Sequence, residues 1–356
     1  MPDRNAYHLA RTLAAVCALL VIYASLHPLV GWHASGVDVF DFIVSPWPRY
    51  FTGFDIAVNV AAYVPLGFLL VPALRAGAKP GWAVLLSVSA CVLLSLALEM
   101  LQNYLPTRVP SNVDWGCNSA GALLGALAGA RWGGAFADHG WLSRWRRRRI
   151  VRGRRGDLGL ILIGAWLITQ LTPAGMFLGT GDLRSLLEVA SPMDYSAHAF
   201  LMLEMSIAVC GIVSAGLIAR QNMREPSPWL LGLMLLLVFL ARSLSAALHD
   251  GVEDALRWLT PGSLDGAAIG ILLLILALQF PVWLQRVVAA LALLAATVLV
   301  NLAPENPYAV QALGNWQAGQ FLNFNGLTRL VSVLWPYAAL AYLMTLPSSA
   351  SARTSR

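Results

Sequence analysis

The sequence predicts an all-α protein that crosses a membrane about ten times, and three observations lead to that fold class. The chain of 356 residues is 58% hydrophobic and only 12% charged, whereas soluble proteins carry about 25% charged residues. Its apolar residues fall in continuous runs of about 20 residues, the length that an α-helix needs to cross a bilayer. These runs are rich in Leu, Ala and Val and lack the alternation of a membrane β-barrel.

The predicted spans follow one another along the chain and are separated by polar or proline-rich segments. The first comes after Arg4 and Arg11 and resembles a signal peptide, but its long apolar stretch lacks a good cleavage site. We therefore expect a retained signal anchor. Ten apolar runs meet the length criterion, at residues 9–30, 55–74, 82–102, 115–135, 157–178, 197–219, 228–248, 264–281, 283–303 and 330–346.

Positive charge predicts the orientation of these spans. Cytoplasmic segments of membrane proteins carry an excess of Lys and Arg, and the most basic stretch, RWRRRRIVRGRR, lies between the fourth and fifth spans. If that stretch is cytoplasmic, both termini are too, and eighteen of the 24 Lys and Arg residues lie on that side against five on the other. The composition, rich in Ala, Leu and Arg, fits a bacterium, so the predicted location is a bacterial inner (plasma) membrane. We expect the basic stretch to contact anionic lipid headgroups rather than nucleic acid.

The pattern divides the chain into three regions. Residues 1–142 are expected to form a four-span unit, residues 143–156 a basic cytoplasmic linker, and residues 157–356 a six-span region. The last external loop, 304–329, is long, aromatic and rich in amides. It is either a functional loop or a segment that its aromatic side chains anchor at the lipid headgroups.

A weak internal repeat connects the two membrane regions. The segment PSNVDWGCNSAGALLG is echoed by TPGSLDGAAIGILLL. Asp55 and Asn59, four residues apart at the start of the second span, are echoed by Asp194 and His198 near the start of the sixth. Sequence alone leaves open whether this is a duplication or a chance match in spans rich in Leu, Ala and Gly.

Cysteine spacing and short motifs exclude several classes of site. The four cysteines lie in or beside apolar runs without the spacing of a disulfide framework or a zinc site. No HExxH, GxSxG, P-loop or dinucleotide-binding motif is present. We therefore predict no metal and no cofactor.

Polar residues cluster where the third and fourth spans meet, in the stretch LALEMLQNYLPTRVPSNVDWGCNSAGALLG at residues 96–125. An ionisable side chain at membrane depth costs about 2.5–3.5 kcal/mol, so chains that retain such residues usually use them. Glu99 and Gln102 lie on one face of the third span. The prolines of LPTRVP then end that helix, and Arg108 lies in the turn. The predicted orientation places this turn on the outer face.

The start of the fourth span adds polar groups to the same place. Ser111 or Asn112 can cap its first turn, where the helix dipole favours the carboxylate of Asp114. Asn118 lies one turn deeper on the same face. The second span begins at the same outer face, so six or seven polar side chains are expected near one pocket.

Small residues continue the fourth span beyond this polar start. Gly121, Gly125 and Gly129 are spaced four residues apart, which is the GxxxG pattern of closely packed membrane helices. We therefore expect the fourth span to lie against a neighbouring helix along this face.

Two chemistries suit the outer polar cluster, and a structural role is the alternative. Arg108 can hold a phosphate or a carboxylate with its planar guanidinium. Glu99, in an apolar wall, is the candidate general acid or base. Alternatively, Glu99 and Arg108 neutralise one another while their neighbours satisfy helix ends. The candidate substrate-binding residues beside Arg108 are Gln102, Asp114, Asn118, Asp55 and Asn59.

Weaker candidates lie in the six-span region. Asp194 and His198 are either a polar pair at the outer end of the sixth span or residues of the interface. Glu204 and Arg242 lie inside spans, where a charge pair between two helices is the favoured interpretation.

The order of these motifs resembles the VanZ-like family of bacterial membrane proteins, named after an accessory teicoplanin-resistance protein. The family's first motif more often has His where Asn59 stands, and Asp194-x3-His198 is closer to that form. The resemblance implies a four-span core and a role at the cell envelope, with glycopeptide antibiotic resistance as a family association, and it implies no particular reaction. It rests on Asp55-x3-Asn59-x3-Tyr63-x3-Gly67, Glu99-x2-Gln102-x5-Arg108 and Asp114-x3-Asn118-x2-Gly121-x3-Gly125, within residues 50–135.

Three hypotheses about function follow. The leading one is a protein that binds or modifies an anionic, lipid-linked envelope molecule in the outer polar cluster, whether or not it is an enzyme. The second is a membrane scaffold or partner subunit whose glycine-lined helices pack against another membrane protein. The third is a transporter, which ten spans and a possible repeat would suit, although the polar residues gather at one face rather than at the bilayer midplane.

Overall fold

The computed structural model describes residues 7–48, 53–75, 80–136, 140–151, 153–172, 175–187, 189–304 and 322–346. Within these ranges the regular secondary structure is helical, so the predicted all-α fold is confirmed. Most of the loop 304–329 falls outside the described residues, so its predicted role stays a prediction.

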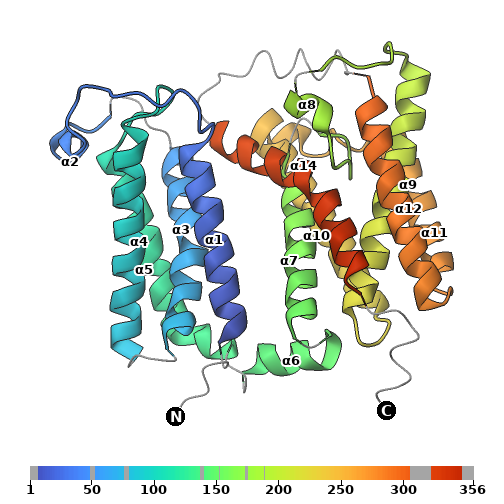
Figure 1. Cartoon of the computed structure of the whole chain (residues 1–356), viewed down its shortest axis with the longest axis horizontal. Helices are drawn as coiled ribbons and strands as arrows, with labels where there is room; N and C mark the ends of the chain where they lie inside the picture. Colours follow the sequence, from blue (N-terminus) through green and yellow to red (C-terminus); the bar gives the residue numbers. More distant parts are fainter. Residues whose placement is uncertain are drawn as a thin grey trace. The chain divides into compact units, whose positions relative to one another are not determined.

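The chain divides into two compact units (Figure 1). Unit 1 comprises Met1–Arg148 and Gln320–Leu327, and unit 2 comprises Arg149–Gly319 and Thr328–Arg356. The division passes through two helices, α6 (Trp141–Arg149) and α14 (Leu322–Met344).

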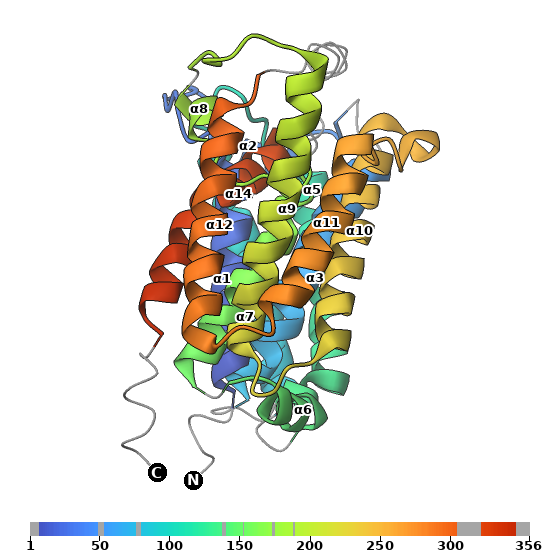
Figure 2. The ribbon, with the colours of Figure 1, turned by 90° about the vertical axis from the view of Figure 1, so that its right-hand side faces the viewer.

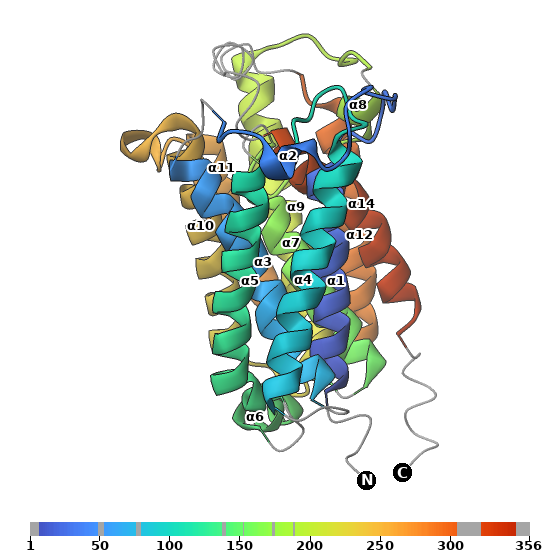
Figure 3. The ribbon, with the colours of Figure 1, turned by 90° about the vertical axis from the view of Figure 1, so that its left-hand side faces the viewer.

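Unit 1 contains four long helices that lie side by side (Figure 3). Successive long helices run in opposite directions, so α1 and α4 end where α3 and α5 begin. We call that end of unit 1 the site end, because the polar cluster of the sequence lies there. Its elements are α1 (His8–Leu26), α2 (Asp41–Val44), α3 (Gly53–Leu74), α4 (Pro80–Gln102), α5 (Asn112–Trp132) and the 3-10 helix η1 (Gly133–Phe136).

Unit 2 is built around α9, which packs between α11 and α12 (Figure 2). A short helix, α8, precedes α9 just as α2 precedes α3 in unit 1. The elements are α7 (Arg154–Thr169), α8 (Leu183–Leu187), α9 (Ala197–Asn222), α10 (Pro228–Asp250), η2 (Val252–Asp254), α11 (Pro261–Ala277), α12 (Val282–Leu302) and most of α14.

Seven helices of the described part are long and apolar enough to cross a membrane: α1, α3, α4, α9, α10, α12 and α14. This confirms a multi-pass membrane protein. Each of the other three predicted spans also coincides with a helix, but α7 has 16 residues, α11 has 17, and α5 is rich in Gly and Ala and carries Asp114. α7 and α11 are therefore shorter than the seven spans, and α5 is less apolar than they are.

Part of the predicted basic linker is helical. Residues Trp141–Arg149 form the helix α6, since arginine is a good helix former and the segment contains no Gly or Pro. Its side chains are not buried. This arrangement suits a helix that lies in water or among lipid headgroups.

Glycines bring α5 into backbone contact with α3. A Cβ at Gly121, Gly125 or Gly129 would overlap a carbonyl oxygen of α3, at Val60, Val64 and Phe68 in turn. The approach is reciprocal, because a Cβ at Gly67 of α3 would overlap the carbonyl of Ala122. The GxxxG pattern therefore does what the sequence predicts, and α3 and α5 form the closest helix pair of unit 1.

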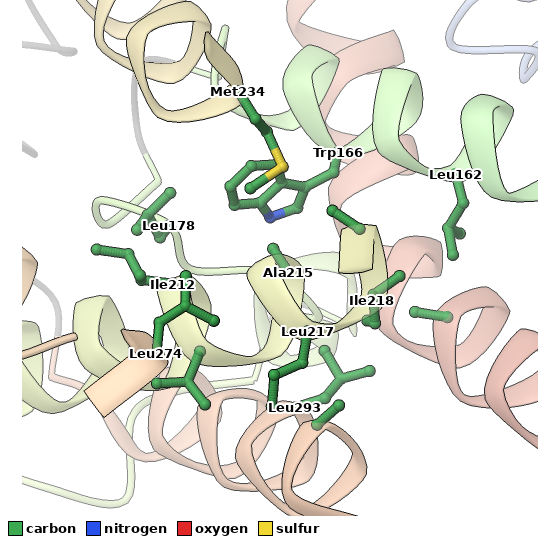
Figure 4. Packing of buried hydrophobic residues seen from close by; sticks show 14 of the residues in the cluster. Leu162, Trp166, Leu178, Ile212, Ala215, Leu217, Ile218, Met234, Leu274 and Leu293 are labelled. Atoms are coloured by element: carbon green, nitrogen blue, oxygen red, sulfur yellow. The ribbon is translucent and has the colours of Figure 1, made fainter. Parts of the chain in front are cut away.

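The core of unit 2 is apolar and centred on α9. Ile212, Leu217 and Ile218 of α9 are almost fully buried, and Trp166 of α7 packs over the same helix with Met234 of α10 (Figure 4). One hydrogen bond within this apolar core joins α14 to α7: the indole N–H of Trp335 donates to the carbonyl of Leu162 at 2.8 Å.

We expect Gly125→Ala to destabilise unit 1, because the added methyl group must displace the α3 backbone at Val64. Overpacking of this kind costs about 1–3 kcal/mol. Gly116→Ala is the matched control, because Gly116 is on the same helix with nothing within 4 Å of its Cβ position, and alanine favours a helix over glycine by about 1 kcal/mol. The measurement is the Tm of the two purified variants in detergent. Equal values would contradict the close α3–α5 contact.

Candidate functional site

The site end of unit 1 gathers the polar residues that the sequence singles out. They come from α3, α4, α5 and the turn between α4 and α5. Each makes a hydrogen bond to, or has a charge near, a neighbouring element of the unit, and the groups fall into three sets described in turn.

The first set joins α4 to the start of α5. Ser111 is the N-cap of α5, and its hydroxyl accepts a hydrogen bond from the backbone N–H of Asp114 at 3.3 Å. Glu99 is only 3% exposed, and its Oε2 accepts the backbone N–H of Ser111 at 2.9 Å. Among the described residues, none donates a hydrogen bond to the other oxygen, Oε1. The carboxylate is thus positioned through one oxygen while the second remains uncommitted.

The second set joins α3 to α5. The Asn59 amide donates to Oδ1 of Asp114 at 2.8 Å. Asp55 lies one turn before Asn59, close enough for its negative charge to repel that of Asp114.

The third set ties the turn to the end of α1. Arg108 donates from Nε to the carbonyl oxygen of His27 at 3.1 Å, and Nη2 donates to the same oxygen. Gln102 donates to the carbonyl of Ser25 at 2.9 Å. Carbonyls in the last turn of a helix lack intrahelical donors, so these side chains complete the end of α1.

Burial and charge act in opposite directions on Arg108. Burial lowers the pKa of its guanidinium from the ordinary value, and the negative charge of Glu99 partly opposes that shift. An arginine still remains charged at neutral pH. The hydrogen bonds of Arg108 go to the carbonyl of His27, and that of Glu99 comes from the N–H of Ser111. The two side chains therefore attract one another through their charges without a hydrogen bond between them.

A buried polar layer lies one turn deeper than Glu99. Asn118 of α5 donates to the hydroxyl of Ser95 of α4 at 2.9 Å. Tyr63 of α3 is 2% exposed, and its hydroxyl lies near Ser95 and Glu99. This hydroxyl makes no hydrogen bond of ordinary geometry to the described residues. Tyr63 therefore adds a buried phenol beside Ser95 and Glu99.

The structure distributes the predicted residues around helix ends. Glu99, Arg108 and Asp114 are linked through charge, because Glu99 lies within electrostatic reach of both other residues. Gln102, Asn59 and Asn118 instead direct their amides to neighbouring helices. The arrangement leaves a carboxylate, a guanidinium and a phenol as the groups with chemical capacity.

Sequence reasoning missed two residues of this site. Ser95 lies four residues before Glu99, on the same face of α4, and that spacing was a usable signal. Tyr63 belongs to the first motif, but an isolated tyrosine in an apolar span is usually a core residue, so its proximity to Glu99 is visible only after folding.

The secondary candidates in unit 2 are not a helical pair. Asp194 precedes α9, which begins at Ala197, and both Asp194 and His198 are exposed. The four-residue step therefore does not place them on one helix face. Across the described residues, no three His, Cys, Asp or Glu side chains converge as they would around a metal ion.

Comparison with known proteins finds a similarity in the first part of the chain. Residues 11–132 match the VanZ/LLP1 family. The matched range begins within α1, ends with α5 and includes every residue of the site end. No curated protein and no solved structure matches the chain.

We expect Asn59→Asp to destabilise unit 1, because it removes the amide donor and adds a third carboxylate beside Asp55 and Asp114. A lost bond to a charged group costs about 1.5–3 kcal/mol. The loss should be smaller at pH 5 than at pH 8, since protonation of one carboxylate removes the repulsion and restores a donor. The measurement is Tm against pH. Asn59→Asp with Asp114→Asn exchanges donor and acceptor and should recover stability; failure of this pair would contradict the assigned bond.

Proposed function

We propose, on the premise that residues 11–132 belong to the VanZ-like family, that the protein binds or modifies an anionic, lipid-linked molecule of the bacterial cell envelope at its site end. The observation that carries the proposal is that Glu99 and Arg108 lie within electrostatic reach of one another. Both are held by backbone groups, Glu99 is buried and Arg108 is partly buried, and Glu99 retains an uncommitted oxygen.

Arg108 would bind the anionic headgroup. A guanidinium presents five N–H donors, and here two of its nitrogens share the single carbonyl oxygen of His27. The remaining N–H directions suit a phosphate or carboxylate, which accepts bidentate hydrogen bonds from arginine. The low-polarity surroundings strengthen that attraction compared with water.

Glu99 would act as the acid or base if the molecule is modified. A general acid or base must reach the proton that it transfers, and Oε1 of Glu99 is the uncommitted atom of this cluster. Gln102, Asp114, Asn118, Asp55 and Asn59 would shape the site, chiefly by holding the helix ends that surround it.

The proposal includes a topology. Ten spans with both termini in the cytoplasm, in the plasma membrane, would place the site end on the outer face. Charge supports this orientation, because the arginine-rich helix α6 follows α5 at the opposite end of unit 1 and basic segments favour the cytoplasm.

A scaffold role is the second candidate, and one observation favours it. Most hydrogen bonds of the polar cluster end on another element of unit 1 rather than pointing into open space. A membrane subunit that presents its outer turn to a partner protein would need such bonds and no ligand. The two candidates differ in what a well-folded variant does.

We expect Arg108→Ala and Glu99→Gln to reproduce the envelope-lipid profile of a deletion strain while the proteins stay in the membrane. The physical reason is that each substitution removes one of the two charges, the guanidinium of Arg108 or the carboxylate of Glu99, that the proposed site uses. The measurement compares lipids and lipid-linked glycans in the deletion strain complemented with each variant, with membrane abundance quantified in parallel.

The matched control is Arg75→Ala. Arg75 also donates to a helix-end carbonyl, that of Ala130 at 2.7 Å, but at the opposite end of unit 1. It therefore reports the cost of removing a guanidinium that only supports structure. If Arg108→Ala and Arg75→Ala give the same lipid profile, or if all variants fail only by leaving the membrane, the binding proposal is wrong and the scaffold candidate stands.

A further inference from the structure

Unit 2 repeats the element order of unit 1. In each, a helix is followed by a connection that contains a short helix and then by three longer helices: α1, α2, α3, α4 and α5 in one, and α7, α8, α9, α10 and α11 in the other, where η2 is added between α10 and α11. In unit 1, α5 packs on α3, and in unit 2, α11 packs on α9. Order alone is weak evidence, so the contacts within each unit decide the comparison.

The close helix pair is built in the same way in both units. In unit 2, a Cβ at Gly266 of α11 would lie 2.6 Å from the carbonyl oxygen of Met205 of α9. One turn on, a Cβ at Gly270 would lie 3.1 Å from Val209 and Ile212 of the same helix. Glycines four residues apart thus bring α11 onto α9 as they bring α5 onto α3.

The start of the last helix is also built in the same way. Thr260 is the N-cap of α11, and its hydroxyl accepts the backbone N–H of Ser263 at 3.1 Å. In unit 1, the hydroxyl of Ser111 accepts the backbone N–H of Asp114 in the same way. A buried carboxylate then engages the cap residue. Thr260 donates its hydroxyl proton to Oε2 of Glu204 at 2.6 Å, where unit 1 uses Glu99.

The end of the first helix is completed by the same kinds of group. Arg242 donates from Nη1 to the carbonyl of Thr172 at 2.6 Å and from Nη2 to that of Gly175. Ser245 donates to the carbonyl of Leu171 at 2.9 Å. These carbonyls lie just beyond the end of α7. In unit 1, the carbonyls that accept from Arg108 and Gln102 lie at the end of α1.

The charges occupy different elements in the two units. The carboxylate is on α9 in unit 2 and on α4 in unit 1, and the guanidinium is on α10 rather than in a turn. The similarity is therefore one of spatial arrangement, which a sequence comparison by position does not detect. Glu204 and Arg242 are each only 8% exposed, and their charges attract one another.

Helix ends alone do not require such charges. An uncharged serine or asparagine can cap a helix N-terminus, whereas a buried ion incurs a desolvation penalty of several kcal/mol. Unit 2 nevertheless keeps a carboxylate with one oxygen, Oε1, that accepts no hydrogen bond from the described residues. Gly262 keeps side-chain atoms away from this carboxylate, because a Cβ there would lie 2.6 Å from Glu204 Oε2.

We infer that α7–α11 is a structural repeat of α1–α5 and that Glu204, Arg242 and Thr260 form a second centre for an anionic lipid headgroup. The ligand class rests on the proposed function of the site end. The repeat itself rests on the glycine contacts, the caps and the completed helix ends of unit 2. The protein therefore carries two centres of one chemistry, one in each unit.

The test counts bound lipids on the full chain. The purified protein is placed in nanodiscs of phosphatidylcholine containing phosphatidic acid, whose terminal phosphate is the anionic probe, and tightly retained lipids are counted by native mass spectrometry after detergent release. We expect two phosphatidic acid molecules per chain, one after either Arg242→Ala or Arg108→Ala, and none after both. Arg242→Lys, which keeps the charge and one donor to a carbonyl, should retain part of the binding if Arg242→Ala does not fold.

Arg220→Ala is the matched control in unit 2. Arg220 donates to the carbonyl of Met223 at 3.1 Å, beyond the other end of α9, and its loss should leave the count at two. If Arg108→Ala removes one lipid and the Arg242 variants remove none, the second centre is refuted while the proposed function stands. If the Arg242 variants remove one and Arg108→Ala none, the proposed function of unit 1 fails instead. Equal counts with phosphatidic acid and phosphatidylcholine alone refute both.

Discussion

The close contact between α3 and α5 is the constraint on which the rest of unit 1 depends. Glycines let the two backbones approach until a methyl group would not fit, which suits a membrane, where helices associate through packing and hydrogen bonds rather than through the hydrophobic effect. Because short side chains then span the gap, Asn59 reaches Asp114 directly. The position of α5 also places Ser111 where Glu99 can accept its N–H.

Helix ends account for the way the charges are held. A helix that ends inside a membrane protein leaves N–H or C=O groups that must find partners, and both units supply them from side chains. A carboxylate engages the start of α5 in unit 1 and of α11 in unit 2, and a guanidinium engages the end of α1 and of α7. The same groups that complete the fold are therefore those with chemical capacity, so stability and binding share residues and must be measured separately.

Unit 2 resembles unit 1 in its helix contacts, its cap and its charged residues. The family match covers only residues 11–132, yet unit 2 uses the same close helix pair, the same kind of cap and the same pair of charges. Unit 2 then adds α12 and most of α14 around a strongly apolar core. An extended second unit of this kind would allow one chain to present two headgroup centres without requiring a second copy.

The sequence by itself determined the all-α membrane fold, because runs of about 20 apolar residues have few other solutions in a bilayer. It also predicted a close helix contact along the face of Gly121, Gly125 and Gly129, whereas the structure identified α3 as the partner helix. Only the tertiary structure decided the partners of the polar groups: that Arg108 bonds to His27 rather than to Glu99, and that Tyr63 lies beside Glu99. These contacts join residues distant in the chain, and their geometry depends on how whole helices pack, which no local spacing encodes.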